Sequence, residues 1–286
     1  MKVGIIGSGG REHALCVSLK NSSFIDKVYC LPGNAGTDQI AENVDIDIGD
    51  FRTLANFIKK NEIEIVLIGP EKPLVEGIVD FFEKEGIKVF GPNKLASQLE
   101  GSKIFTKKIC KKFQIPTAKF EIFDDKKQAN DFFKNCKFPV VVKADGLAAG
   151  KGVYICEKEN QAQDAVNEIF GGKFGEAKEV LIEEFLKGEE MSFFIISDGV
   201  SFKDFGTAQD HKRVFEGDKG KNTGGMGAYS PSRLENETLN KKIIDKIIQP
   251  TLNALQQENI KFKGFLYAGL MVINNEPFLI EYNVRM

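Results

Sequence analysis

Residues 143–153 read Lys143-Ala-Asp-Gly-Leu-Ala-Ala-Gly-Lys-Gly-Val153, a run of small residues between two lysines. The small residues Gly146, Ala148, Ala149 and Gly150 let backbone amides approach an anion closely. Lys143 and Lys151 flank them with positive charge. The stretch therefore predicts a loop that binds phosphate groups.

A P-loop is excluded by two residues of the same stretch. Asp145 stands where that motif has its first glycine, and Gly152 replaces the hydroxyl that would bind magnesium. The β-prone run Val153–Cys156 follows where a P-loop would begin a helix. We therefore predict a strand at Phe138–Lys143, the glycine loop and a second strand, forming a hairpin that folds over phosphates. An ordinary flexible hairpin tip is the alternative for this stretch taken alone.

Downstream, Val180–Glu190 is an apolar strand that runs into carboxylates and a turn glycine. Such a segment can offer backbone groups to an adenine edge and a carboxylate to ribose hydroxyls. Solvated turn charges are the alternative for Glu189 and Glu190.

The terminal segment Phe278–Arg285 alternates polar and apolar residues. Because side chains alternate along a strand, Glu281, Asn283 and Arg285 are expected on one face. A carboxylate and an amide oxygen two residues apart are hard ligands for magnesium. Arg285 beside them suits a phosphoryl or acyl-phosphate oxygen. A half-exposed edge strand with a polar face is the alternative.

Composition indicates a reduced, globular protein. The 286 residues are enough for two domains or subdomains, and the net charge of −2 gives no support for attraction to nucleic acid or membranes. The five cysteines form no C-x-x-C and there are only two histidines, so a zinc site is not expected. Met1 begins a strand directly, without a signal peptide, which predicts a cytoplasmic location. Solvated helix faces are expected for the densest basic runs, Lys107-Lys108, Lys111-Lys112 and Lys241-Lys242.

Three zones follow one another along the chain. Residues 1 to about 100 alternate strands and helices, which predicts a parallel sheet with flanking helices. Its expected elements are Val3–Ile6, Glu12–Leu19, Val28–Leu31, Phe51–Lys60, Ile65–Ile68, Val75–Lys84 and Val89–Phe90. Beyond it we expect helices at Ser102–Phe113, near Lys126–Lys134 and Asn160–Phe170, and over Glu237–Gln257.

The first zone carries its own candidate anion site. Gly7-Ser-Gly-Gly-Arg-Glu-His13 follows the first strand and opens a helix, so backbone amides and the helix N-terminus can hold a phosphate. A nicotinamide-dinucleotide fingerprint is the weaker interpretation, because Glu12 occupies the third glycine position. The second strand also ends in Leu31-Pro-Gly-Asn-Ala-Gly36, without an acid for ribose. Arg11 at the helix start favours a binding role.

Together these elements resemble an ATP-grasp enzyme, which phosphorylates a carboxylate and lets a nucleophile, usually an amine, attack the acyl phosphate. Longer strings narrow the resemblance to the phosphoribosylamine–glycine ligase (glycinamide ribonucleotide synthetase) family. The strings cover the whole chain in order, and those within 11–15 and 223–231 are highly specific. They are Gly7–Leu15, Pro32–Thr37, Gly69–Leu74, Gly91-Pro92, Leu99–Lys103, Lys143–Val153, Gln209–Arg213 and Asn222–Pro231.

The resemblance implies that ATP, glycine and 5-phosphoribosylamine give glycinamide ribonucleotide, ADP and phosphate through a glycyl phosphate, the second step of de novo purine biosynthesis. It implies an α/β chain with an N-terminal Rossmann-like domain (1–100) and an ATP-grasp domain (101–286) whose lid subdomain spans about 115–187. The implied partners are small molecules, and the full-length form is expected to be monomeric.

The resemblance also implies roles for individual residues. Glu281 and Asn283 would ligate Mg²⁺ or Mn²⁺, and His211 would be structural. The residues that would bind ATP are Lys103, Lys143, Gly146, Gly150, Lys151, Gly152, Glu183, Glu184, Leu186 and Glu190. Those that would bind the other substrates are Gly9, Gly10, Arg11, Glu12, Asn34, Ala35, Gly36, Asn222, Thr223, Gly224 and Gly225. The expected catalytic residues are Arg285, Asp210, Lys212 and Arg213.

Three features depart from the family pattern. The penultimate strand (264–273) lacks the acidic metal ligand that many ATP-grasp enzymes place there, and Lys221 stands where proline is usual. The chain also stops at Met286, inside the terminal motif and without the family's C-terminal domain. The second hypothesis is therefore a truncated nucleotide-binding fragment without full ligase activity, or half of a split enzyme with a complementing C-terminal fragment. Because chain ends fray, such a fragment would keep ATP affinity but turn over poorly.

Overall fold

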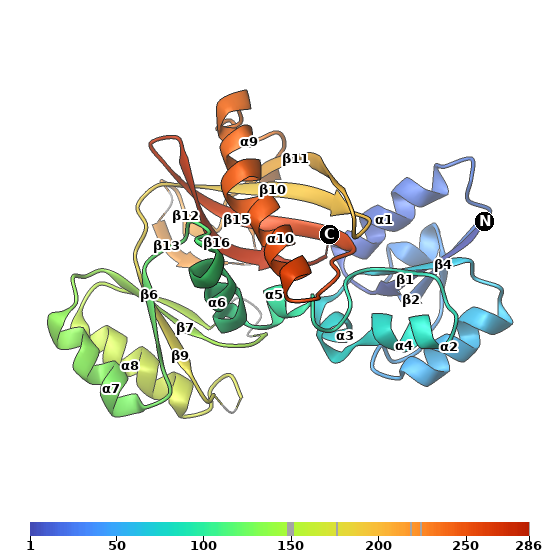
Figure 1. Cartoon of the computed structure of the whole chain (residues 1–286). Helices are drawn as coiled ribbons and strands as arrows, with labels where there is room; N and C mark the ends of the chain where they lie inside the picture. Colours follow the sequence, from blue (N-terminus) through green and yellow to red (C-terminus); the bar gives the residue numbers. More distant parts are fainter. Residues whose placement is uncertain (148–151, 176, 218, 224, 286) are drawn as a thin grey trace.

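The structure is a computed structural model that describes residues 1–147, 152–175, 177–217, 219–223 and 225–285. Three parts follow one another in space: an N-terminal α/β unit, a central antiparallel sheet, and a smaller sheet with two helices that projects to one side (Figure 1). Helix α6 (Lys103–Phe113) packs against α10 and β16 of the central part. The predicted α/β fold class is confirmed.

The N-terminal unit is a parallel sheet in the order β3-β2-β1-β4-β5 over the residues described. Its strands are β1 (Lys2–Gly7), β2 (Lys27–Pro32), β3 (Glu42–Asn43), β4 (Ile65–Ile68) and β5 (Val89–Phe90). Its helical segments are α1 (Gly10–Lys20), η1 (Thr37–Gln39), α2 (Phe51–Lys60), α3 (Glu71–Glu76) and α4 (Ile78–Lys84). The single helix expected over Val75–Lys84 is wrong. Gly77, at φ +98°, ends α3 and precedes α4, a left-handed conformation that glycine adopts without strain.

The central sheet is antiparallel, in the order β14-β11-β10-β15-β16. Its strands are β10 (Glu189–Ser197), β11 (Phe202–Asp210), β14 (Ala228–Tyr229), β15 (Gly264–Ile273) and β16 (Glu276–Asn283). One face packs against α9 (Glu237–Ile243), a π-helical segment (Ile244–Ile248) and α10 (Gln249–Gln257), so the long helix expected at 237–257 is present with a π turn inside it. A separate hairpin pairs β12 (Arg213–Phe215) with β13 (Lys219–Asn222).

The small sheet has the order β6-β9-β7-β8 and confirms the predicted strand–loop–strand hairpin, with Lys143 opposite Val153. Its strands are β6 (Phe120–Phe123), β7 (Val140–Ala144), β8 (Val153–Cys156) and β9 (Val180–Glu184). The helical segments α7 (Lys126–Phe132), η2 (Phe133–Asn135) and α8 (Glu159–Phe170) cover one face and close a core of its own.

The N-terminal unit and the central sheet share one hydrophobic core, which contains Ile6 of β1 and Leu54 of α2 from the first and Phe193, Leu266 and Leu279 from the second. The short helix α5 (Gln98–Gly101) connects the two parts and lies against α3 and β16. Throughout the described ranges, no helix is both long and apolar enough to cross a membrane.

Candidate active site

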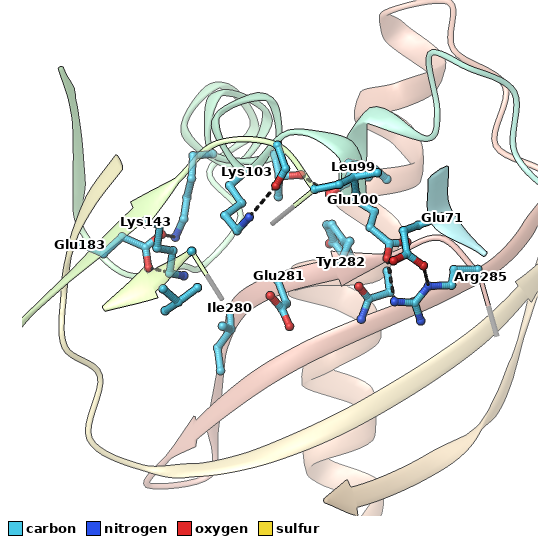
Figure 2. Close-up of a pocket in the computed structure, with 17 residues that line it drawn as sticks. Glu71, Leu99, Glu100, Lys103, Lys143, Glu183, Ile280, Glu281, Tyr282 and Arg285 are labelled. Carbon is cyan, nitrogen blue, oxygen red and sulfur yellow. Dashed lines mark hydrogen bonds and ion pairs between the residues drawn. The ribbon is translucent and has the colours of Figure 1, made fainter. Parts of the chain in front are cut away.

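The candidate active site is a cavity of about 430 Å³ that α6, the β7–β8 hairpin and the terminal strand β16 enclose (Figure 2). Lys103, the first residue of α6, donates from Nζ to the carbonyl of Gly146 (3.0 Å). Lys143 enters from β7, and Gly152 lines the cavity at the start of β8. Burial lowers the pKa of Lys103, although Glu281 opposes this shift. Lysines from two separate elements thus face one cavity, as binding of a polyphosphate requires.

A buried charge cluster forms the inner wall of this cavity. Glu183 on β9 lies 2.8 Å from Lys107 through Oε1 and 2.8 Å from Lys143 through Oε2. Burial opposes ionisation of Glu183, but the two ammonium groups hold its pKa below the ordinary value. Lys107 is 2 % exposed, so its expected place on a solvated helix face is wrong. The Glu183 carboxylate is thus engaged by these two lysines, while its role in ATP binding stays a prediction.

Asp145 ties the glycine loop to the start of α6. Its carboxylate accepts hydrogen bonds from Ser102 Oγ (2.9 Å) and from the backbone N–H of Ile104 (3.1 Å). Ser102 Oγ in turn caps the helix. The residue that excludes a P-loop therefore fixes the loop beside Lys103. The predicted residues Gly150 and Lys151 lie outside the described residues.

The segment after β9 brings a predicted nucleotide residue against a predicted catalytic residue. Glu190 Oε2 lies 2.7 Å from Lys212 Nζ, and Asp210 lies 4.0 Å from the same ammonium group. Burial lowers the pKa of Lys212, but Glu190, Tyr267 and Asp210 together raise it above its ordinary value. Glu184 accepts a hydrogen bond (2.9 Å) from the backbone just before β6, and Leu186 is half-buried in the connection to β10.

The strand β16 presents the two predicted metal ligands. Glu281 lines the cavity, and no described residue donates a hydrogen bond to its carboxylate. The side-chain amide of Asn283 donates to Glu100 Oε1 (3.0 Å), which leaves its carbonyl oxygen for another partner. Two such oxygens on one face of a strand fit a hard divalent cation. Nowhere in the described part of the chain do three or more His, Cys, Asp or Glu residues form a group that could hold a metal.

Arg285 follows β16 and is held by carboxylates from two other segments. Its Nε lies 3.1 Å from Glu71 Oε2 on α3, and its Nη2 lies 2.8 Å from Glu100 Oε1 on α5 (Figure 2). Arg11 Nη2 lies 3.7 Å from the same Glu71 oxygen. Burial raises the pKa of Glu100 to about 7, although Arg285 opposes this. These ion pairs link the terminal strand to the N-terminal glycine loop.

The N-terminal glycine loop is built around Glu12. The buried carboxylate of Glu12 accepts a hydrogen bond from the Gly9 N–H (2.5 Å), and a Cβ atom at Gly7, Gly9 or Gly69 would overlap it. The protein itself thus uses one amide at the N-terminus of α1, which leaves a phosphate fewer free donors than expected. The same carboxylate fills the space that a dinucleotide-binding loop keeps open with glycine.

The two predicted loops of the N-terminal unit are joined by Asn34. Its side-chain amide donates to Ser8 O (2.8 Å), and its Oδ1 accepts from the Gly36 N–H (2.8 Å). Gly10 and Ala35 are exposed on the same two loops. The predicted residues of 9–11 and 34–36 therefore lie on two adjoining loops, and Glu12 is buried beneath them.

The predicted substrate segment after β11 is held by backbone contacts. Thr223 donates to the Lys212 carbonyl from both its N–H (2.7 Å) and its Oγ1 (2.9 Å), and Gly225 N–H donates to Thr223 Oγ1 (3.1 Å). Arg213 and Asn222 face each other across the β12–β13 hairpin. Their side chains, like residue Gly224, are not among those the structure describes. The imidazole of His211 packs near the Tyr229 ring, with centroids 5.9 Å apart.

Sequence reasoning missed three charged residues of the cavity: Glu71, Glu100 and Lys107. Two of them stand inside strings used for the resemblance, Gly69–Leu74 and Leu99–Lys103, but neither string shows that its glutamate reaches residue 285. Lys107 follows Lys103 by one helical turn, and this spacing could have placed both lysines on one face of α6.

Comparison with known proteins assigns the chain to a family. The N domain of phosphoribosylglycinamide synthetase matches residues 1–100, and the ATP-grasp (A) domain of the same enzyme matches residues 101–286. The chain belongs to the phosphoribosylglycinamide synthetase family. This confirms the resemblance and favours the ligase over the fragment hypothesis. Phosphoribosylamine–glycine ligases from Brucella melitensis and Clostridium acetobutylicum are 48 % and 42 % identical over all of this chain, which spans 67 % and 69 % of their lengths.

Solved structures share the fold of this chain. The phosphoribosylamine–glycine ligase of Thermotoga maritima superposes with a TM-score of 0.86 at 35 % identity, over all of this chain and 69 % of that one. The D-alanine–D-alanine ligase of Bacillus anthracis, solved with ATP, superposes over 99 % of this chain and 86 % of its own with a TM-score of 0.67. The biotin carboxylase domain of a Hydrogenobacter thermophilus carboxylase, solved with MgADP, gives 0.74 over all of this chain and 64 % of its own. At 19 % and 18 % identity, the last two show a shared fold alone.

Proposed function

We propose that the chain ligates glycine to 5-phosphoribosylamine at the expense of ATP, giving glycinamide ribonucleotide, ADP and phosphate. The observation that carries the proposal is the convergence of Lys103, Lys143, Glu281 and Arg285 on one cavity in a chain of this family. These side chains come from three elements that only the folded chain brings together. Phosphoryl transfer depends on such positioning and on charge neutralisation more than on covalent help from the protein.

In this proposal the cations of the cavity bind the nucleotide. Lys103 and Lys143 hold the α- and β-phosphates, the loop at 144–152 closes over them, and Glu183 keeps Lys143 in place. Glu184 and Leu186 lie at the adenine, and Glu190 accepts from the ribose hydroxyls. The lid subdomain at about 115–187 and a domain boundary near residue 100 belong to the same proposal.

Glu281 and Asn283 are the residues that would hold Mg²⁺ or Mn²⁺. When bound, the metal would neutralise charge on the phosphate oxygens. Arg285 binds an oxygen of the phosphoryl group that is transferred.

A carboxylate oxygen of glycine attacks the γ-phosphorus while the bond to ADP breaks, which gives glycyl phosphate. The phosphoribosylamine nitrogen then attacks its carbonyl carbon, phosphate leaves, and the amine gives up a proton.

The remaining candidate residues seat glycine and phosphoribosylamine. We assign phosphate and sugar binding to the joined loops at 9–12 and 34–36, and glycine binding to the segment that contains Asp210, Lys212, Arg213 and 222–225. Held close together, the amine and the acyl phosphate need little further activation.

The test is release of ADP by the purified chain. ADP should form only when Mg²⁺, glycine and phosphoribosylamine are all present, and omission of any one should stop it. Phosphate release that does not depend on glycine, or oxidation of a substrate with NAD in place of ATP turnover, would overturn the proposal.

A further inference from the structure

Glu100 contacts three consecutive residues at the end of the terminal strand. Its Oε1 accepts from the Asn283 side-chain amide (3.0 Å) and lies 2.8 Å from Arg285 Nη2, while its Oε2 accepts from the Val284 N–H (2.8 Å). The side chain of Glu100 is 7 % exposed, so water competes little for these contacts. One buried carboxylate thereby holds the whole end of this strand.

The contacts with Asn283 and Arg285 restrict side-chain rotations that matter at the cavity. With its nitrogen on Glu100, the Asn283 amide can turn only its oxygen toward a cation. The guanidinium of Arg285 is planar, and Glu71 at its Nε together with Glu100 at its Nη2 fixes that plane. Its remaining N–H groups are then available for a phosphoryl oxygen.

The position of Glu100 in the chain strengthens this link. It belongs to α5, which ends at Gly101, and Lys103 begins α6 two residues later. The segment that carries the phosphate-binding lysine therefore also anchors the strand that carries the metal ligands. The two halves of the cavity are held in register through one side chain.

We propose that Glu100 is a positioning residue for the ligation, setting the orientation of Asn283 and Arg285. The inference rests on the proposed function and adds to it a residue that acts through Asn283 and Arg285. A buried ion pair that serves stability alone is the competing explanation. The two differ because positioning acts on kcat and on metal-dependent binding, whereas stability acts on the melting temperature.

The experiment compares Glu100→Gln with the unaltered chain in steady-state kinetics and ADP calorimetry. We expect kcat to fall about 10- to 100-fold, the cost of a small misplacement, with KM for ATP and the metal-free Kd for ADP within about twofold. The gain in ADP affinity on adding Mg²⁺ should become smaller. Glu276→Gln is the matched control, because Glu276 lies on the same strand and pairs with Lys242 and Lys246 away from the cavity. Its kinetics should be unchanged.

Two results would overturn the inference: a kcat within about twofold of the unaltered chain, or a fall in kcat that is matched by an equal loss of metal-free ADP affinity. If Glu100→Gln does not fold, Glu100→Asp replaces it, and its kcat and metal-free ADP affinity are judged in the same way. Aspartate keeps the charge but moves it away from the strand. If the unaltered chain makes no glycine-dependent ADP, the proposed function fails. The inference is then judged on Mg²⁺-dependent ADP binding alone.

Discussion

Lys212 Nζ lies 2.7 Å from Glu190 Oε2, so one ion pair joins the segment assigned to ribose to the segment assigned to glycine. Both side chains are partly exposed, at 30 % and 40 %. Ribose hydroxyls that bind Glu190 would share it with Lys212. Nucleotide binding at Glu190 would therefore change the contacts of the Lys212 ammonium group directly.

Glu190→Gln is expected to weaken ATP affinity about tenfold, because an amide accepts from ribose hydroxyls less strongly than a carboxylate does. Calorimetric titration with ATP measures the change. Glu189→Gln is the matched control, because Glu189 is the adjacent residue and its carboxylate pairs with Arg233, not with Lys212. Equal losses in both variants would contradict the assignment.

Lys143→Ala is expected to weaken ATP binding by about 1.5–3 kcal/mol, because it removes a charge-assisted contact with phosphate. The dissociation constant, measured by calorimetry, should rise accordingly. Lys108→Ala serves as control, because Lys108 is exposed and only approaches Glu179 at 3.9 Å. Unchanged affinity in Lys143→Ala would mean that the glycine loop is an ordinary hairpin tip.

Lys107→Met is expected to destabilise the fold by about 3 kcal/mol, because the buried Glu183 loses one of its two cations. Urea unfolding at pH 7 measures the loss. Adding Glu183→Gln to this variant should recover part of the stability, since the unpaired charge is then removed. A change in Lys107→Met no larger than in Lys108→Met would disprove the stabilising role.

The free energy of unfolding should depend on pH in a way that reflects ionisation of the Glu183 carboxylate. Its folded pKa is lowered from about 4.5, so its charge stabilises the fold fully above that value, and the contribution is lost as the pH falls through the folded pKa. The difference in unfolding free energy between the unaltered chain and Glu183→Gln should therefore be constant near neutral pH and shrink in acid. Glu121→Gln, on the exposed face of β6, should show no such trend. A difference that grows in acid would reverse the assigned sign.

Removal of divalent metal should stop ADP formation and weaken ADP binding, because the phosphate charge then stays unneutralised. Glu281→Gln should make ADP affinity nearly insensitive to Mg²⁺, as followed by calorimetry with and without EDTA. If Glu281→Gln responds to Mg²⁺ as fully as Glu276→Gln does, the metal site lies elsewhere.

The sequence alone predicted most helices and strands, together with the binding patterns formed by residues close to one another in the chain. The glycine hairpin at 143–153 and the strand that carries Glu281 and Asn283 are local patterns, since glycine content and period-two alternation act within a few residues. The same holds for the parallel sheet of the first zone. The break at Gly77 is also local, but nothing in the string required a left-handed residue there.

Only the tertiary structure decided which charges meet. Glu100 and Arg285 are 185 positions apart. Glu183 pairs with Lys143 and with Lys107, which the sequence placed on a solvated helix face. Such pairs depend on how α5, α6, β9 and β16 pack, and a charged residue shows its partner only when burial removes water from both. The resemblance of the sequence strings to a known family thus predicted the reaction class, while packing alone fixed the network of charges around the cavity.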